Sequence, residues 1–472
     1  MPYTAPGVYL EDIFLQPEVI LPTGIPGFIG FADAIATLQN LPQGIHFPDS
    51  LPDPVKDKLD YDLDKKCLIF KGVMSTQAKN QLQTLSSDLP FKKAVEYLWQ
   101  QAQAVVVLHR QQEFIDKYDT PDGYLTEAVI GFFENGGTLC YVVRADPDNN
   151  NPQQALIEAI NTLDVLTDID LVVIPDAMSL LPKLPDDPMR LATDVITLDE
   201  WQRRAKEAEP MVIRVQQAVI QHCEKHGDRF AILDALPEKT SESVLTQCND
   251  IKEGLTPEAL RNGTFYYPWL MRLTKNAQGQ SLLRSVPPCG HIAGIFARSD
   301  RARGVFKAPA NEEIRDAVNL EVLIENSDQG ELNAQGINCL RAFPGRGIRV
   351  WGARTLSNDS SWRYINVRRL FITIKRWIDL NMVWAAFEPN TPQLWVRIQR
   401  ELSGYLTQLW RVGAFKGETP ELAFYVKCDA EINPPESREM GNVFTEIGFA
   451  PSSPAEFIFV RITHRANTSE LS

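Results

Sequence analysis

Helices and short apolar strands alternate through the middle of this 472-residue chain, and that alternation restricts the fold more than any other feature. Alternation of this kind is typical of a sheet that is parallel over much of its width and covered by helices. The sequence therefore predicts an α/β fold mixed with α+β segments. The expected elements are a helix over 124–134, a strand over 139–143, a helix from 151 to about 163, a strand over 171–174, a helix ending near 226 and a strand over 230–233.

Further extended segments are expected on both sides of this region. They are rich in β-branched and aromatic residues and are bounded by glycine and proline, as strands are. These expected strands cover 20–34, 265–273, 422–427 and 443–449.

Residues 36–120 differ in character from the rest of the chain. A proline-rich stretch is followed by a hairpin-like piece at 66–74 and by helical runs at 75–85 and 89–103. Because insertions survive best in exposed loops, we interpret 36–120 as an inserted small α+β module.

A basic, aromatic block occupies residues 341–417. It holds 13 Arg and Lys against four Asp and Glu, a surplus of nine positive charges in a chain whose net charge is −14, and six of the nine tryptophans. Trp and Arg are enriched at binding hot spots, so the block suggests a docking surface for an acidic partner. A Trp-rich core coated by arginines is the alternative, and composition does not separate the two.

Two amphipathic helices are expected within this block. Asn366 is a candidate N-cap for an apolar stripe from 367 to 378, and Thr391-Pro392 begins a second helix that Gly413 can close. The first helix carries four cationic residues that lie mostly off its apolar stripe, so one side is expected to be cationic. These residues are Arg368, Arg369, Lys375 and Arg376.

Both chain ends contain extended apolar runs, at 8–13 and at 456–463, flanked by proline. A lone strand must pair its backbone groups with another strand. Each run therefore adds to a sheet edge, either in its own subunit or in a neighbour. The residues alone leave both alternatives open.

Bulk properties exclude several classes of function. A net charge of −14 argues against general nucleic-acid binding, although the basic block leaves a local exception open. The seven cysteines form no C-x-x-C pair and are expected to be reduced thiols. The first ten residues lack signal-peptide features and no apolar run approaches about 18 residues, so neither signal-directed secretion nor membrane insertion is expected.

Two groups of residues resemble metal sites, and neither has a complete ligand pattern. His222 and His226 have the i, i+4 spacing of zinc ligands, but the pattern lacks the glutamate of H-E-x-x-H and is more typical of a helix end. Asp60, Asp62 and Asp64 have the spacing of the first ligands of a calcium-binding loop. The later positions do not fit, because Lys65 stands where the loop needs glycine and Lys71 where it needs glutamate. No metal or cofactor is expected.

The residues allow two alternative functions. Asp176 and Asp234 each follow an expected parallel strand, where α/β enzymes place catalytic or metal-binding acids. No glycine-rich phosphate loop or G-x-S-x-G elbow accompanies them, so an α/β metal-dependent enzyme is the weaker hypothesis. A binding scaffold acting through residues 40–120 is the other.

The chain resembles the tail sheath proteins of contractile phages and of phage-tail-like contractile injection systems. The resemblance covers nearly everything except about 36–120 and rests on motifs that come in the family's order. They are PGVYLED (6–12), GFFENGGTLCYVVRA (131–145), DRFAILDA (228–235), FYYPWL (265–270), PPCGHIAGIFARSD (287–300), RGVFKAPAN (303–311), RAFPGRGIRVWGARTLS (341–357), WRYINVRRL (362–370), FEPNTPQLW (387–395) and APSSPAEFIFVRI (450–462).

The resemblance implies a non-enzymatic subunit of a helical tube of stacked hexameric rings around an inner tube, which contracts to drive that tube through a target envelope. It implies a sheath-like core with extended terminal β-arms. The implied domains are an N-terminal arm (1–19), a core (20–35 and 121–340), an outer-surface module (36–120), a C-terminal domain facing the inner tube (341–453) and a C-terminal arm (454–472).

Specific residues follow from the same resemblance. Arms are expected to pair with C-terminal sheets of neighbouring subunits, and the cationic helix residues named above are expected to contact the inner tube. The arm residues are Val8, Tyr9, Leu10, Ile13, Phe457, Ile458, Phe459, Val460 and Ile462, and the acceptor residues are Phe424, Val426, Val443 and Ile447.

Partners follow as well. The implied partners are other copies of the chain, an inner tube protein, and baseplate and terminator or cap proteins, with sheath paralogues as a further alternative. Neither nucleic acid nor direct membrane insertion is implied. Assembly is expected in the bacterial cytoplasm, in a virion tail or phage-tail-like particle that is either released or anchored through other components.

Overall fold

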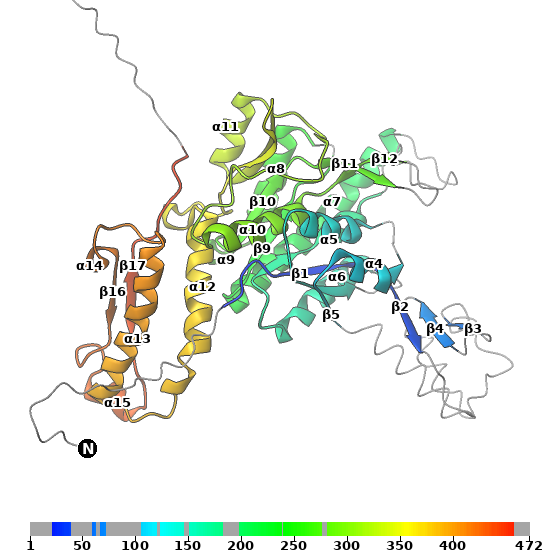
Figure 1. Cartoon of the computed structure of the whole chain (residues 1–472). Coiled ribbons are helices and arrows are strands. Elements are labelled where there is room, and N and C mark those ends of the chain that lie inside the picture. Colours follow the sequence, from blue (N-terminus) through cyan, green and yellow to red (C-terminus); the bar gives the residue numbers. More distant parts are fainter. Residues whose placement is uncertain are drawn as a thin grey trace, which may run out of the picture.

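The computed structural model (Figure 1) describes residues 21–38, 59–62, 67–71, 105–119, 123–145, 151–182, 198–237, 239–275 and 281–456. At its centre lies an eight-stranded sheet in the order β15-β14-β10-β9-β8-β1-β7-β5. The six inner strands are parallel and the two edge strands are antiparallel to their neighbours. The parallel strands are β1 (Pro26–Phe31), β7 (Cys140–Ala145), β8 (Leu171–Val173), β9 (Phe230–Asp234), β10 (Gly263–Tyr267) and β14 (Ile337–Phe343), and the edge strands are β5 (Val106–Leu108) and β15 (Gly347–Trp351).

Helices cover both faces of this sheet, and the two faces bury separate apolar clusters. The strand–helix alternation predicted from the sequence is therefore confirmed, with boundaries shifted by one or two residues. Asn151 caps its helix as expected, because its side chain accepts from the Gln154 N–H at 3.1 Å. Helices α6 (Pro152–Thr162), α7 (Leu198–His226) and α8 (Ser241–Lys252) pack on one face, and α5 (Tyr124–Glu134) and α10 (Cys289–Arg303) pack on the other.

Two strand predictions are wrong. Residues 265–273 do not form one strand: Pro268, which lacks an N–H, separates β10 from β11 (Leu270–Lys275), and β11 belongs to a three-stranded sheet with β12 (Ser281–Val286) and β13 (Asn319–Leu320). Of the hairpin-like piece expected at 66–74, the structure describes residues 67–71, which form one strand and no hairpin.

The segment 66–74 instead contributes the single strand β4 (Cys67–Lys71), which pairs with β2 (Asp33–Leu38) and β3 (Leu59–Asp62). β2 also pairs with β6 (Tyr118–Asp119), completing a four-stranded sheet. The helical runs expected at 75–85 and 89–103 lie outside the described residues. Smaller elements are α4 (Gln111–Lys117), η1 (Leu163–Val165), η2 (Pro175–Leu180), α9 (Pro257–Leu260) and α11 (Asn326–Ala334).

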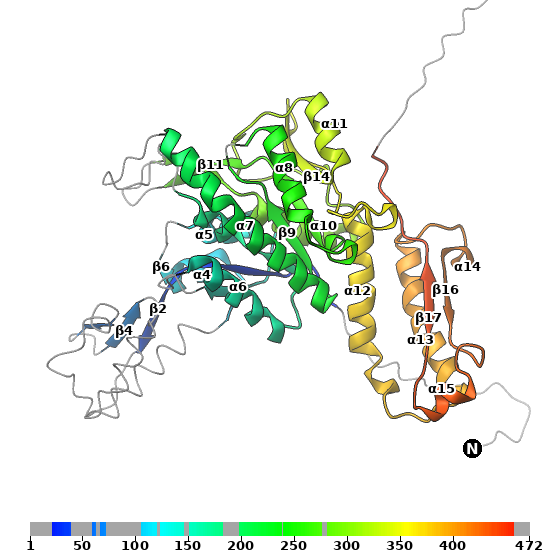
Figure 2. The same ribbon diagram turned by 180° about the vertical axis from the view of Figure 1, so that it is seen from behind.

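A smaller C-terminal unit lies beside the central sheet (Figures 1 and 2). The boundary expected at 340/341 falls inside β14, so the basic block begins in the large sheet and only its later part belongs to this unit. The unit consists of α12 (Ile365–Asn381), α13 (Pro392–Arg411), α14 (Pro420–Ala423), α15 (Pro435–Glu439) and the strands β16 (Phe424–Lys427) and β17 (Glu446–Phe449), with the short helices η3 (Ser360–Trp362) and η4 (Val383–Ala385).

Helix α12 is the wall shared by the two units. Ile365 and Ile372 belong to the core of the central sheet, whereas Leu370, Ile374 and Trp377 pack toward α13. The Trp377 ring stacks on Tyr405 of α13 at 4.0 Å.

The predicted second helix is confirmed, with Thr391 at the N-cap, Pro392 at the first helical position and Gly413 at positive φ. The predicted cap of the first helix is wrong. Helix α12 begins at Ile365 with Tyr364 as N-cap, and the Asn366 side chain instead donates to the Phe306 and Ser452 carbonyls.

A buried histidine between α5 and α10 predicts how stability depends on pH. His291 is fully buried against Gly131, and neither ring nitrogen has a hydrogen-bond partner within the described part of the chain. Burial, with a smaller effect of Arg272, lowers the pKa of His291 to about 3. Unfolding therefore takes up a proton below the ordinary pKa of about 6.5, and stability falls as the pH drops through that window.

We expect the free energy of unfolding of wild type to fall by about 2 kcal/mol more than that of His291→Met between about pH 6.5 and pH 5, because one proton costs about 1.4 kcal/mol per pH unit. Urea unfolding at the two pH values measures this difference. Equal pH dependence in the two proteins would contradict the assignment.

Candidate interaction site at the C-terminal sheet

The two strands of the C-terminal unit form a small sheet with an open outer edge. β16 and β17 are antiparallel, with Val426 opposite Ile447. The Ala450 N–H donates to the Ala423 carbonyl at 2.9 Å, which sets the hydrogen-bonded pairs at every second position along β17. The backbone groups of Ile447 and Phe449 therefore point away from β16. No third strand pairs with this sheet among the described residues.

The sequence predicted most of this sheet. Phe424, Val426 and Ile447 lie in the two strands, and their side chains pack against the apolar cluster of the unit. Val443 is wrongly placed in a strand, because β17 begins at Glu446, although Val443 packs against the same cluster. The acceptor role of these residues stays a prediction.

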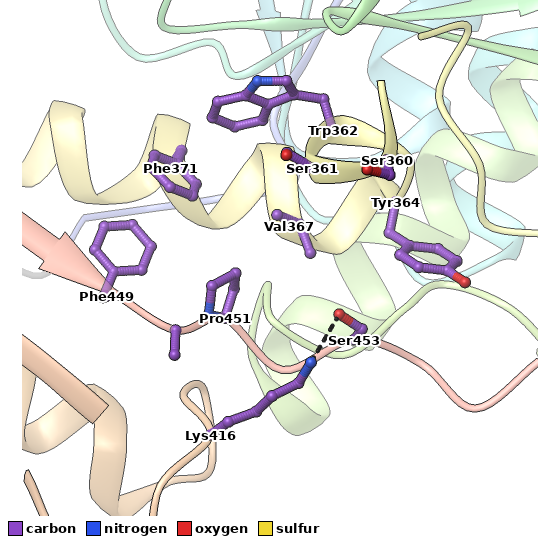
Figure 3. Close-up of a pocket in the computed structure, with 11 residues that line it drawn as sticks. Ser360, Ser361, Trp362, Tyr364, Val367, Phe371, Lys416, Phe449, Pro451 and Ser453 are labelled. Carbon is purple, nitrogen blue, oxygen red and sulfur yellow. Dashed lines mark hydrogen bonds between the residues drawn. The ribbon is translucent and has the colours of Figure 1, made fainter. Parts of the chain in front are cut away.

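A pocket of about 390 Å³ lies beside the end of β17. Its walls come from the start of α12, the η3 turn and the chain that follows β17 (Figure 3). The Phe371 ring lies 4.2 Å from Phe449 and 4.7 Å from Trp362, so three aromatic rings line one side. The other lining residues are Ser360, Ser361, Tyr364, Val367, Lys416, Ala450, Pro451 and Ser453.

Sequence reasoning missed this pocket. Its residues come from three stretches of the chain, 360–371, 416 and 449–453. The predicted apolar stripe of the first helix includes Val367 and Phe371, but no sequence pattern links the three stretches to one another. Arg354 and Glu456 were missed for the same reason. Arg354 Nη2 donates to Glu456 Oε2 at 2.5 Å and its Nε donates to Oε1 at 3.0 Å. This bidentate pair ties Glu456 to the central unit.

The first described residues of the chain, Leu21 and Pro22, also contact the C-terminal unit. Leu21 packs against the apolar cluster of the C-terminal unit, and Arg376 of α12 contacts the Pro22 carbonyl at 3.4 Å. The predicted arm residues lie outside the described residues at both ends. These are Val8, Tyr9, Leu10, Ile13, Phe457, Ile458, Phe459, Val460 and Ile462.

The cationic side predicted for α12 is present, but three of its four residues are buried. Arg368, Arg369 and Arg376 are buried, with 8%, 2% and 5% of their surface exposed. The helical pattern placed them correctly on one side, but that side packs against the central unit. Lys375 is exposed and donates to the His226 carbonyl at 2.9 Å.

Each buried arginine has partners inside the chain. Arg369 Nη2 donates to Asp170 Oδ2 at 2.8 Å and to Asp300 Oδ2 at 2.6 Å. Arg368 donates twice to the Asn262 side chain, at 2.7 and 2.9 Å. Arg376 donates to the Asp168 carbonyl at 2.9 Å. These bonds join the C-terminal unit to the central sheet, so the basic block serves internal cohesion at these positions.

The tryptophans of the block are partly internal too. Trp377 and Trp395 are buried, and the other four are half-buried. The core interpretation of the block is thus closer to the structure than the docking interpretation, although three of its arginines, Arg368, Arg369 and Arg376, lie inside the protein.

Asp176 and Asp234 are helix-capping residues. Asp176 follows β8 at the point where the strand order reverses around β1, a position that holds ligands in many α/β folds. Its carboxylate accepts backbone N–H bonds from Phe31 at 2.7 Å and Tyr124 at 2.5 Å. Asp234 accepts from the Cys289 N–H, where α10 begins, at 2.9 Å.

Burial raises the pKa of both carboxyls, that of Asp234 to about 7. Both are fully enclosed and already hold helix-terminal N–H groups, so neither is placed to meet a substrate. The metal-dependent enzyme hypothesis built on them is wrong.

One group of three potential metal ligands lies close together among the described residues: Asp164, His222 and His226. Asp164 already accepts from Lys225 Nζ at 2.7 Å and lies 2.8 Å from His226 Nε2. Its pKa falls to about 2, mainly because of the Lys225 bond. Arg229 Nη1 approaches His222 Nε2 at 3.2 Å. Cationic donors fill the positions that a metal ion would take, so we assign no metal ligand here.

Within the described ranges, every helix is too short or too polar to cross a membrane.

Comparison with known proteins gives two family matches. The model of the phage tail sheath protein central domain matches residues 187–356, and the model of the phage tail sheath C-terminal domain matches residues 357–465. The chain is 27% identical over 177 residues to a putative prophage major tail sheath protein of Pseudomonas aeruginosa (strain UCBPP-PA14). That stretch is 37% of this chain and 44% of the relative, so the match spans less than half of the relative's length.

Solved structures resemble the whole chain. The helical sheath of the anti-feeding prophage in its contracted state is 25% identical with a TM-score of 0.61, covering 98% of this chain and 100% of that one. The sheath complex of the extracellular contractile injection system PVC, also contracted, is 23% identical with a TM-score of 0.59, covering 98% and 99%. At 23% identity, the similarity to the PVC sheath supports a shared fold and nothing more.

Proposed function

This chain belongs to the phage tail sheath protein family, and we propose that it is the repeating subunit of a contractile sheath. Copies assemble into a helical tube of stacked hexameric rings around an inner tube, and contraction drives that tube through a target envelope. The observation that carries the proposal is the two-stranded sheet β16–β17, whose β17 edge offers unpaired backbone groups among the described residues. An exposed edge of this kind is a template for a strand from another chain.

The chain ends supply the strands in this proposal. Val8–Ile13 of one neighbour and the run after Glu456 of another add to the sheet of a given subunit. The ion pair between Arg354 and Glu456 supports this route, because it holds the start of the C-terminal run on the central unit. In Figure 1 the segment after β17 leads away from the small sheet.

A rigid-body mechanism follows. Arg368, Arg369 and Arg376 tie the C-terminal unit to the central sheet, so each subunit moves as one body. The connection at 14–19 absorbs the change in dihedral angles while strand pairing keeps neighbours joined. Residues 451–455 are held within the subunit, because the Ser452 N–H donates to the Ala414 carbonyl and Arg354 holds Glu456. During contraction the weaker contacts with the inner tube and the baseplate are released, and more favourable contacts form between sheath subunits.

Fewer residues of α12 are available for an inner-tube contact than the sequence predicted. Lys375 is the exposed member of the predicted set, and we propose that it contributes to a screened, temporary grip on the tube. Arg368, Arg369 and Arg376 have no such role in the conformation described, because all three are buried.

Other partners complete the particle. The module expected at 36–120 is too long, because β5 (Val106–Leu108) is an edge strand of the central sheet. We place the part of this range that precedes β5 on the outer surface of the tube, and baseplate and terminator proteins at its two ends. The anti-feeding prophage baseplate structure contains a chain of this fold, with a TM-score of 0.61. The particle assembles in the bacterial cytoplasm and acts as a virion tail or an injection device.

Removal of residues 1–15 tests the polymer. We expect the truncated chain to remain folded, with an unchanged circular dichroism spectrum, and to form no tubes in negative-stain images where the full chain does. The reason is that it lacks the donor strand while its own acceptor sheet is intact. Tubes formed by the truncated chain would contradict the proposal.

A further inference from the structure

We propose, building on the polymer function above, that a basic surface on the central unit of one copy of this chain docks on an acidic surface on the C-terminal unit of a second copy. The two surfaces differ, so the contact repeats head to tail and generates a ring or a helix instead of a closed pair. The basic surface consists of Arg301, Arg303, Arg315, Arg346 and Arg349, and the acidic surface consists of Glu418, Glu421, Glu436 and Glu439.

The segment 311–315 holds the basic surface together. Its Arg315 N–H donates to the Asn135 side chain at 2.9 Å, and that side chain donates back to the Arg315 carbonyl at 3.1 Å. Arg298 of α10 donates to the Asn135 carbonyl at 3.0 Å and to a carbonyl of the segment at 2.7 Å. From the other side, Arg349 of β15 donates to a carbonyl of the segment at 2.8 Å. Side chains from α10, from this segment and from the β14–β15 hairpin therefore meet on one surface.

The tip of the hairpin presents Arg346 to solvent. Gly345 and Gly347 flank it with φ of 70° and 72°, the left-handed region that favours glycine. The Arg346 guanidinium lies 6.0 Å from the Phe343 ring, and that ring packs against Trp351 at 4.5 Å. The tip is thereby ordered before a partner binds, so docking loses little conformational entropy there.

The charge of the basic surface is not neutralised inside the subunit. Four of the five arginines are exposed, the fifth is half-buried, and within the described ranges none pairs with a carboxylate. Arg301, for example, donates to the Gly136 carbonyl at 3.2 Å. Glu312 does not compensate them, because Lys307 donates to it at 2.7 Å. The surface therefore keeps a surplus of positive charge even beside the carboxylate of Glu313.

The outer side of the C-terminal unit carries the opposite charge. Residues 418–446 hold seven carboxylates and two cationic side chains. Lys427 pairs with Glu431 at 2.7 Å, and the Arg438 guanidinium lies 5.8 Å from the Trp395 ring. The four glutamates of the acidic surface are exposed, and none has a cationic partner in the described part of the chain. In both views α14 and β16 lie on the side of the unit farthest from the central sheet (Figures 1 and 2).

The two surfaces do not meet within one subunit. Among the described residues, no hydrogen bond or ion pair joins the five arginines to the four glutamates. Opposite charges that stay exposed in a chain of net charge −14 attract one copy to the next and orient its approach. Leu422 and Met440 beside the acidic surface are each 70% exposed, so the contact also has apolar area to bury.

Charge reversal on each surface tests the contact in the full chain, without any tube protein. Arg315→Glu with Arg346→Glu reverses the basic surface, and Glu418→Lys with Glu439→Lys reverses the acidic surface. All four side chains are exposed, so the circular dichroism spectrum and the melting temperature should stay close to wild type. We expect each double variant to raise the critical concentration for tubes about tenfold, because attraction at two positions becomes repulsion.

The matched control is Lys206→Glu with Arg214→Glu. Both side chains are exposed on α7, and the change in net charge equals that of the variant with the reversed basic surface. This control should assemble within about twofold of the wild-type critical concentration. An equal loss in the control would show that net charge, and not this contact, governs assembly, which would overturn the inference.

Mixing the two reversed variants identifies the partner. The reversed basic surface of one variant matches the reversed acidic surface of the other, so an equimolar mixture should form tubes at the wild-type concentration although neither variant does so alone. The four substitutions combined in one chain should restore assembly as well. A mixture that assembles no better than its components would show that these surfaces do not face each other.

Salt provides an independent check. Raising NaCl from about 0.05 M to about 0.5 M screens the attraction in wild type and the repulsion in the variants, so the difference of about tenfold should shrink to about twofold. A difference that persists at high salt would contradict a charge contact. Tubes from the Arg315→Glu and Arg346→Glu variant at the wild-type concentration would overturn the docking assignment alone, whereas wild-type chain that never forms tubes would contradict the sheath function itself.

Discussion

Replacing Arg369 with methionine is expected to lower the free energy of unfolding by about 3–5 kcal/mol, the largest single-residue effect in the described chain. Asp170 and Asp300 are about as buried as the arginine, with 3% and 8% of their surface exposed. Removing Arg369 leaves two carboxylates in a water-free interior without their cation. Urea unfolding of the unassembled chain at pH 7 measures the loss.

A neighbouring arginine supplies the matched control. Arg376 lies two turns further along α12, is equally buried and donates only to backbone carbonyls. Arg376→Met leaves neutral acceptors, so its cost should be about 1–3 kcal/mol. Equal losses for the two variants would show that charge compensation is not what Arg369 provides.

Two further observations would identify the cause. Burial raises the pKa of Asp300 and Arg369 opposes that effect, so without Arg369 the carboxyl should take up a proton more readily. A raised folded pKa adds stability at low pH and loses it as the pH rises, so the deficit of Arg369→Met should shrink between pH 7 and pH 5. Combining Arg369→Met with Asp170→Asn and Asp300→Asn should recover most of the loss.

This ion-pair cluster shows where sequence reasoning stopped. The periodicity of α12 correctly placed the arginines on one side of a helix, because periodicity depends on neighbours three and four residues away. It gave no information on what covers that side. The partners of Arg369 are 69 and 199 residues away along the chain, and only the fold brings them together.

Sequence patterns correctly predicted the features that depend on residues close to one another in the sequence. The Asn151 cap, the Thr391-Pro392 start of α13, the end of that helix at Gly413 and the alternation through 124–234 depend on residues close in sequence, and each was predicted. Asp176 was located correctly after its strand and assigned the wrong role. The amide groups that occupy it belong to the start of α5 and the end of β1, which sequence distance hides.

Replacing Ile447 with proline is expected to disrupt strand pairing between subunits, and this is the second prediction with a large effect. The Ile447 N–H points to the outer edge of β17 and takes no part in the pairing with β16, because the hydrogen-bonded positions on β17 are those in register with Ala450. Ile447→Pro removes this donor and puts the ring in the path of an incoming strand, while proline at an edge position is tolerated within a sheet. Ile447→Ala loses similar bulk and keeps the N–H.

We expect both variants to fold, Ile447→Ala to form tubes, and Ile447→Pro to raise the critical concentration at least tenfold, about 1.4 kcal/mol per contact, because a lost ladder bond and a steric block act together. Sedimentation and negative-stain images of the two proteins at matched concentrations measure this. Tubes from Ile447→Pro at the wild-type concentration would mean that no strand adds to β17. Growth would then have to proceed through the β16 edge, where Val426→Pro would be the informative substitution, because the outward groups of Val426 occupy the equivalent position on that strand.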